Sequence, residues 1–217
     1  MHFPPLGSSA LPGTPDPGGA LHLAGLRGGR VQFAHQVGNR HVQGTGEQKE
    51  ATHRSTIERM NIRRVSFHHP DATTLNGQVQ AEYHVRYGDG GDATPLAPSD
   101  FEPPNGAYLI AYDESGRPVA TGGWRRQDKN DKGNEDGDAE LKRMYVIEEM
   151  RGRGIARRIL AALEEDARTA GRTRMVLETG ARQPEAVALY TSSGYEPCAK
   201  FGYYRFHELS LCFAKPL

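Results

Sequence analysis

The sequence predicts an α/β sandwich with a mixed sheet. Runs that are typical of strands and of helices alternate from residue 61 to the C-terminus, which is the order expected of a layered α/β domain. Two apolar runs, 107–112 and 118–125, flank Asp113-Glu114-Ser115-Gly116, a turn signal that predicts a hairpin. A long amphipathic run, 155–170, lies between two further strand-like runs, 139–147 and 175–179.

The remaining elements follow in order along the chain. Residues 62–67 predict a first strand, and 71–87 predict a helix opened by Pro70-Asp71, although Gly77 weakens it. Residues 88–104 predict a loop that includes a short helix near Ser99-Asp100. The polar run 127–138 is interpreted as a solvated connector, since the spacing of a calcium loop is absent.

The second half predicts two helices and a last strand. Ile155, Ile159, Ala162, Leu163 and Ala167 give the 155–170 helix one apolar stripe, and Gly171 closes it. A second helix covers 183–190, with a proline in its first turn, where a missing N–H costs nothing. The segment 204–214 alternates loosely and predicts an antiparallel strand.

Composition excludes several classes of protein. The chain has 217 residues, enough for one domain of about 150 residues plus an extension. Its 27 basic and 27 acidic residues balance, so no global charge favours nucleic acid or an anionic membrane. No apolar run approaches the roughly 20 residues of a membrane span. Cys198 and Cys212 lack metal-ligand spacing and form no disulfide framework, so a cytoplasmic setting is expected.

Residues 1–59 differ from the rest of the chain. They are rich in glycine and proline and show no helical or strand period of useful length. We predict a disordered extension, because such a segment buries too little apolar surface to offset its ordering entropy. An alternative is that the natural start lies near Met60. The predicted globular domain is 60–217.

Arg151-Gly152-Arg153-Gly154-Ile155-Ala156 predicts an anion site. The segment joins a strand to a helix whose first N–H groups have no intrahelical partner and carry the positive end of the helix dipole. A diphosphate can dock on such groups, and glycine lets the backbone approach it. A P-loop would need Lys-Ser or Lys-Thr after its second glycine, and a dinucleotide fingerprint would need a small residue where Arg157 stands. The segment therefore matches neither of these two phosphate-binding motifs.

Two blocks together carry a family resemblance. Arg-x-x-Gly-x-Ala at 151–156 resembles the acyl-CoA pyrophosphate loop of the GNAT N-acetyltransferase superfamily. Downstream, Ala186-Val187-Ala188-Leu189-Tyr190 followed by Gly194-Tyr195 resembles the second half of that cofactor site. The resemblance covers roughly residues 60–217. It implies a GNAT-like α/β sandwich, with a central mixed, mostly antiparallel sheet flanked by helices.

The resemblance implies a site for acetyl-CoA as co-substrate, with no metal. The strand edge at Met144, Tyr145 and Val146 would pair with the pantetheine arm, and such strands are usually bulged. A Val146 N–H would then face the thioester oxygen. Gln183 stands where many relatives carry an asparagine that binds pantetheine. The implied pyrophosphate and charge contacts come from Arg151, Gly152, Arg153, Gly154, Ile155, Ala156 and Arg157.

Two residues are candidates for the chemistry. Glu140 matches a base glutamate of some relatives, and strand alternation predicts that it points to the same side as Val146. An amine with a pKa of about 10 is mostly protonated at neutral pH, so a base or a water must remove its proton. Tyr190 is the candidate acid that protonates the departing thiolate. Their alternatives are a surface glutamate and a packing tyrosine.

The sequence therefore predicts an acyl-CoA-dependent N-acyltransferase that transfers acetyl directly to a primary amine, either of a small molecule or of a peptide. The runner-up is a non-catalytic acyl-CoA-binding domain of the same fold. No nucleic-acid or membrane partner is expected, and a homodimer stays open. Acceptor choice is expected to depend on the first helix, the 88–104 loop, Trp124, Glu178 and the run Phe201-Gly202-Tyr203-Tyr204.

Overall fold

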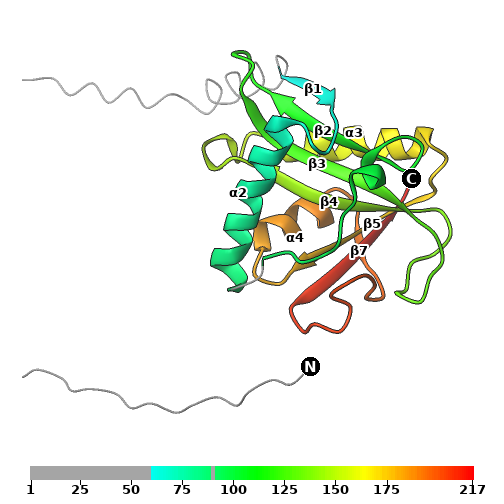
Figure 1. Ribbon diagram of the computed structural model, residues 1–217. Helices are drawn as coiled ribbons and strands as arrows, with labels where there is room; N and C mark the ends of the chain where they lie inside the picture. Colours follow the sequence, from blue (N-terminus) through cyan, green and yellow to red (C-terminus); the bar gives the residue numbers. More distant parts are fainter. Residues whose placement is uncertain (1–59, 89–90) are drawn as a thin grey trace, which may run out of the picture. The chain divides into compact units, whose positions relative to one another are not determined.

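The computed structural model describes residues 60–88 and 91–217. The predictions for residues 1–59 lie outside this part of the chain. One seven-stranded sheet has the order β1-β2-β3-β4-β5-β7-β6, in which only the β4–β5 pair is parallel. The mixed, mostly antiparallel sheet is therefore confirmed (Figure 1). The strands are β1 (Asn61–Arg64), β2 (Gly106–Tyr112), β3 (Pro118–Gln127), β4 (Asp138–Val146), β5 (Arg174–Gly180), β6 (Glu196–Pro197) and β7 (Ser210–Pro216).

In the described residues, three α-helices and two short 3-10 helices accompany the sheet. They are α2 (Pro70–Tyr87), η1 (Pro98–Phe101), η2 (Glu148–Met150), α3 (Ile155–Thr169) and α4 (Pro184–Thr191). The N-terminus of α2 is capped by His69, whose Nδ1 accepts the Asp71 N–H at 3.2 Å. His69 is thus a structural cap. Of the helices in the described part of the chain, none combines the length and apolar character that crossing a bilayer requires.

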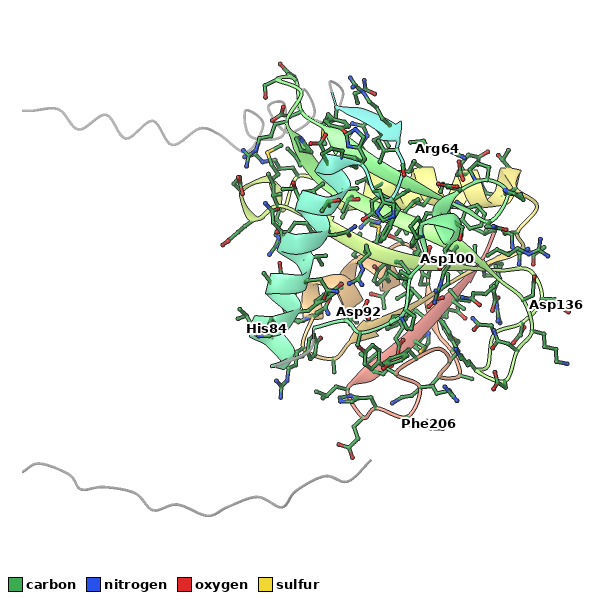
Figure 2. The ribbon with its side chains drawn as sticks, viewed as in Figure 1. Arg64, His84, Asp92, Asp100, Asp136 and Phe206 are labelled. Carbon is green, nitrogen blue, oxygen red and sulfur yellow. The ribbon has the colours of Figure 1, made fainter. Side chains whose placement is uncertain are left out.

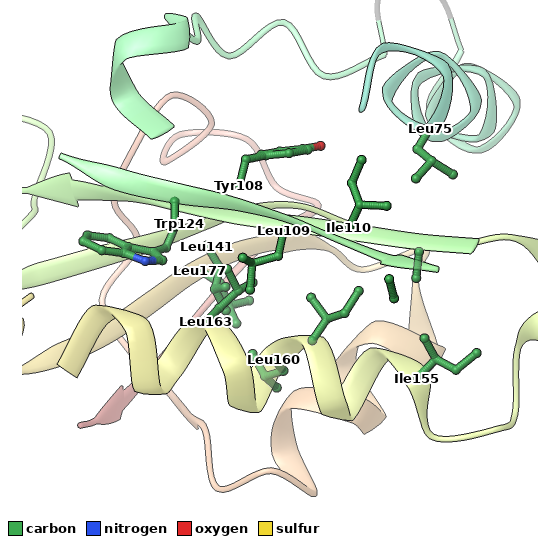
Figure 3. Close-up of a cluster of buried hydrophobic side chains, with 14 of the residues drawn as sticks. Leu75, Tyr108, Leu109, Ile110, Trp124, Leu141, Ile155, Leu160, Leu163 and Leu177 are labelled. Atoms are coloured by element: carbon green, nitrogen blue, oxygen red, sulfur yellow. The ribbon is translucent and has the colours of Figure 1, made fainter. Parts of the chain in front are cut away.

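Helices α2 and α3 cover opposite faces of the sheet. Along β2, Tyr108 and Ile110 point toward the α2 side and Leu109 toward the α3 side (Figure 3). Leu160 and Leu163 of α3 are fully buried against that second face. The predicted apolar stripe of α3 is confirmed, with Leu160 as an additional member. Side chains therefore alternate between these two faces along the central strand β2.

The predicted elements are mostly confirmed, but the last strand was placed too early. Residues between 203 and 209 form local turns instead, since the His207 N–H donates to the Tyr204 carbonyl at 2.8 Å and the Ser210 N–H to the His207 carbonyl at 3.1 Å. β7 therefore begins at Ser210. The loose alternation of residues 204–214 predicts one continuous strand, but its first part belongs to these turns. The exposed Phe206 lies in this loop (Figure 2).

Candidate active site

The strands β4 and β5 separate on one side of the sheet. Their parallel pairing runs from Asp138 opposite Arg174 to Leu141 opposite Leu177, and it stops there although both strands continue. Side chains from both strands line a cavity of about 400 Å³ at this opening. Helices α2 and α4 and the loops before η1 and β7 complete its walls. An open slot between two parallel strands can admit an extended ligand without breaking the rest of the sheet.

A bulge interrupts β4 at the mouth of this slot. Gly123 of β3 pairs with Lys142, while Thr121 pairs with Tyr145, so two residues of β4 lie opposite one of β3. Arg143, one of these two, has a backbone φ of 57°. A positive φ is uncommon for a residue with a side chain and costs free energy. The bulge that the family resemblance implied is present.

The bulge corrects one prediction. Residues paired across an antiparallel ladder share a face, so Glu140, which pairs with Arg125, lies on the same face as Tyr145, which pairs with Thr121. The extra residue moves Val146 to the opposite face. The expectation that Glu140 and Val146 point to the same side is wrong, because simple alternation does not survive a one-residue insertion.

The backbone of Val146 faces the slot. The Ile147 N–H donates to the Val119 carbonyl of β3 at 3.0 Å. Backbone groups alternate in direction along a strand, so the N–H and C=O of Val146 point away from β3 and toward β5. The Val146 carbonyl accepts a hydrogen bond from Arg151 Nε at 2.9 Å. The Val146 N–H has the direction that an oxyanion-binding donor needs.

The glycine turn leads from this edge to α3. Gly152 and Gly154 have φ values of 73° and 75°, in the left-handed region that favours glycine. Gly154 is the N-cap of α3 and supplies no side-chain cap, so the first N–H groups of the helix keep their anion-binding capacity. Ile155 is buried in the core, which leaves only its backbone, with that of Ala156, for a ligand.

The arginines around the turn have protein partners. The Arg151 guanidinium pairs with Glu82 of α2 at 2.5 Å and lies 5.6 Å from the centre of the Tyr145 ring. Arg153 donates to the carbonyl of Glu149 at 3.2 Å. Arg157 donates to the Ser192 carbonyl at 3.0 Å, at the end of α4. A phosphorylated ligand would therefore compete with existing contacts, that of Arg151 above all.

Tyr190 stands in the cavity wall on α4. Its ring is buried and meets Tyr195 edge-on at 5.6 Å. Burial raises the pKa of its phenol, so the phenol is protonated at neutral pH and can donate a proton. Its hydroxyl has no hydrogen-bond partner among the described residues, unlike that of Tyr195, which donates to Glu164 at 2.9 Å. Gln183 also lines the cavity, and its Nε2 donates to the Tyr87 hydroxyl at 3.1 Å.

Glu140 is buried and ion-paired on both of its carboxylate oxygens. Its carboxylate accepts hydrogen bonds from Arg125 at 2.8 Å and Gln127 at 2.9 Å, and it pairs with Lys142 at 2.7 Å. Burial alone would raise the pKa of Glu140, but the charges of Lys142 and Arg125 outweigh it and hold that pKa below its usual range. A carboxylate so stabilised is a weak base. The assignment of Glu140 as the base stays a prediction.

Glu178 of β5 has the opposite character, and sequence reasoning placed it only among residues that select the acceptor. It lines the cavity, and its Oε1 accepts from the Ser210 hydroxyl at 2.5 Å. Its Oε2 is buried without a hydrogen bond. Burial raises the pKa of Glu178 above its ordinary value, which the Ser210 hydrogen bond only partly offsets. Nothing in the sequence distinguishes these two strand glutamates.

The cavity wall opposite the cofactor slot comes from separate segments. Asp92, from the loop after α2, lies beside that helix (Figure 2) and pairs with Arg143 at 3.2 Å. Tyr203 and Tyr204 come from the loop before β7. Trp124 is fully buried and donates to Asp166 of α3, so its predicted role in acceptor choice is wrong. The described residues contain no group of three or more His, Cys, Asp or Glu side chains that could hold a metal ion.

Comparison with known proteins identifies the class. The model of the acetyltransferase (GNAT) family matches residues 75–195. That match spans more than half of the chain, and the chain belongs to this family. An "IAA acetyltransferase" of Azospirillum brasilense is 43% identical over 83 residues, which are 38% of this chain and 54% of that protein. The chain thus matches only about half of that relative's length.

Solved structures agree on the fold. A Klebsiella pneumoniae protein assigned as an acyl-CoA N-acyltransferase is 26% identical, with a TM-score of 0.59 over 73% of this chain and 97% of that one. The PaiA N-acetyltransferase of Thermoplasma acidophilum, solved in complex with coenzyme A, gives a TM-score of 0.53 at 14% identity, covering 73% and 99% of the two chains. At that identity the second likeness concerns the fold alone.

Proposed function

We propose that the protein transfers an acetyl group from acetyl-CoA to a primary amine, directly, within a complex of both substrates. The observation that carries this proposal is the slot between β4 and β5, which opens beyond Leu141 and Leu177. An inward-pointing Val146 N–H lies along it, and the glycine turn of 151–154 lies at its outer end. The coenzyme A held by the Thermoplasma relative supports acetyl-CoA as the ligand.

Each chemical requirement has a candidate group. The Val146 N–H would stabilise the developing oxyanion, and α3 with the glycine turn would bind the pyrophosphate. Tyr190 would protonate the departing thiolate, since it lines the cavity. Two carboxylates compete for the role of base. Glu178 lines the cavity with a raised pKa, whereas Glu140 is held ionised by its partners.

The alternative is a domain that binds acyl-CoA without transferring the group. Tyr190 favours the enzyme, because it lines the cavity and its hydroxyl makes no hydrogen bond to the described residues, although its ring also packs on Tyr195. A sensor would need the slot and the glycine turn but neither Tyr190 nor Glu178.

The test combines binding and turnover. Acetyl-CoA at about 100-fold over its dissociation constant should stabilise the folded protein by about 2.7 kcal/mol, which a thermal melt measures. Thiol release should then be followed with small amines, amino acids, polyamines and lysine peptides. A melt unchanged by millimolar acetyl-CoA would refute the proposal, and binding without thiol release for any amine would favour the sensor.

A further inference from the structure

Two residues of opposite charge line the cavity, and each has a buried polar atom without a hydrogen bond, Nη1 of Arg143 and Oε2 of Glu178. Arg143 of β4 supplies the donors and Glu178 of β5 supplies the acceptor. We infer that the acceptor is an amino acid, or a closely related molecule that carries a primary amine and a carboxylate on neighbouring atoms. This inference rests on the proposed function and goes further, because it names the class of amine.

The Arg143 guanidinium is buried with most of its donors unused. Its side chain is 7% exposed, and Asp92 is its ion-pair partner, at 3.2 Å from Nη1. That contact lacks hydrogen-bond geometry, so Nη1 stays without a hydrogen bond. The hydrogen bond of the guanidinium is a long one, 3.5 Å from Nη2 to the Asp92 carbonyl. A guanidinium has five N–H donors, and a buried one is stabilised by an oxyanion that can accept two of them side by side.

The backbone also directs Arg143 into the cavity at a cost. Among the described residues it is the one non-glycine with a positive φ. Such a conformation costs about 1–2 kcal/mol, which glycine would avoid. Backbone strain of this kind is found mainly at functional sites. The bulge alone, which glycine would serve better, does not explain an arginine here.

Glu178 is the unbalanced charge of the cavity. Lys142 is paired with Glu140, and Arg143 is paired with Asp92. No cation lies within ion-pair distance of Glu178 among the described residues, and its Oε2 is buried without a donor. The ion that complements such a carboxylate is an ammonium, which is the form of a primary amine before it reacts.

One ligand satisfies both groups. An α-amino acid brings a carboxylate to the Arg143 fork and an ammonium to Glu178. A simple amine leaves the unused donors of Arg143 without an acceptor, and a dicarboxylate brings a second negative charge to Glu178. The cavity of about 400 Å³ has room for a side chain as well. The rings of Tyr203 and Tyr204, which meet at 4.8 Å, offer that side chain an aromatic surface.

The experiment compares matched acceptors in the thiol-release assay. For each amino acid of a panel, the acid, its carboxamide and the decarboxylated amine are measured with saturating acetyl-CoA. At least one amino acid should be acetylated, with kcat/KM roughly 10- to 100-fold above that of its amide, as expected for one lost charge-assisted contact. Equal rates for acid and amide overturn the inference but leave the proposed function standing.

Two variants separate the contact from general damage. Arg143→Lys keeps the charge but loses the fork, so kcat/KM should fall roughly 10- to 100-fold for the acid and change less than about threefold for the amide. Arg168→Lys, an exposed arginine paired with Glu165 on α3, is the matched control and should change neither. Equal loss for acid and amide in Arg143→Lys would overturn the inference.

The remaining outcomes also test the inference. If Arg143→Lys does not fold, the comparison of acid and amide on the unaltered protein stands by itself. Acetyl-CoA binding without transfer to any amino acid refutes the inference alone. Absence of acetyl-CoA binding refutes the proposed function, and the inference falls with it.

Discussion

The two halves of the cavity are built in different ways. The cofactor half comes from one stretch of chain, in which β4, the glycine turn, α3, β5 and α4 follow one another between Asp138 and Thr191. The acceptor half is gathered from α2, the loop at 91–94, the bulge at Arg143 and the loop at 203–210. A contiguous site leaves a motif in the sequence, whereas an assembled site leaves only scattered residues. The two halves should therefore respond differently to substitution.

The largest effect is expected at the glycine turn. Gly154→Val should abolish acetyl-CoA binding, because a β-branched side chain resists a φ of 75° and blocks the approach of a phosphate. Gly171→Val is the matched control, since Gly171 has a φ of 77° at the other end of α3 and an added Cβ there would meet no other atom within 4 Å. Titration calorimetry should show binding to the control and none to Gly154→Val. Equal affinities would remove the turn from the site.

Tyr190→Phe should affect the reaction rather than binding. A general acid contributes about 10²–10⁴-fold, so kcat should fall by that factor, or less if water substitutes, while the Kd of acetyl-CoA stays nearly constant. Tyr195→Phe is the control, because the neighbouring Tyr195 hydroxyl donates to Glu164. Its loss should lower the melting temperature without changing kcat. Full kcat in Tyr190→Phe would return Tyr190 to a packing role.

The two glutamates should have opposite effects on stability. Glu140 has a lowered pKa when folded, so its ionisation stabilises the protein above its unfolded pKa and that contribution is lost as pH falls through the folded value. Glu140→Gln breaks a buried ion pair and should cost about 3 kcal/mol at pH 7, and less as the pH falls below about 4.

Glu178 has a raised pKa when folded, so its contribution to stability is present in acid and lost as pH rises. Glu178→Gln should thus raise the melting temperature at pH 7 and lower kcat, while Glu140→Gln lowers the melting temperature. Denaturant unfolding at about pH 3 and pH 7 measures both effects. Destabilisation by Glu178→Gln at pH 7 would show that Glu178 is a structural carboxylate.

The contrast between the two halves also explains what the sequence could predict. The helix at 155–169 and the glycine turn were predictable because the spacing of apolar residues and the positions of the glycines depend on residues close together in the sequence. A bulge in this strand was expected from the family resemblance alone, but its position at Arg143 was not, since a one-residue insertion has no compositional mark and reverses the alternation beyond it. Nor could sequence separate Glu140 from Glu178. Both are strand glutamates, and only tertiary packing gives one of them cationic partners.

The smallest effect is expected where the two halves meet, at Gln183. This residue stands where many relatives have a pantetheine-binding asparagine, yet its amide here donates to Tyr87 of α2 at 3.1 Å. Gln183→Asn shortens the side chain by one methylene, so it should lose that hydrogen bond and about 0.5–1.5 kcal/mol of stability. Tyr87→Phe removes the same bond from the other side.

If Gln183 serves only α2, the two changes should cost the same and the double variant should cost no more than either. The Kd of acetyl-CoA should then stay within about threefold throughout, since a hydrogen bond that the cofactor never makes cannot be lost. If Gln183 instead binds the cofactor, Gln183→Asn alone should alter that Kd, whereas Tyr87→Phe should free the amide and improve binding. Melting temperatures and titration calorimetry on the three variants distinguish these cases. An altered Kd would extend the contiguous half of the site by one residue, and an unchanged one would assign Gln183 to the support of α2.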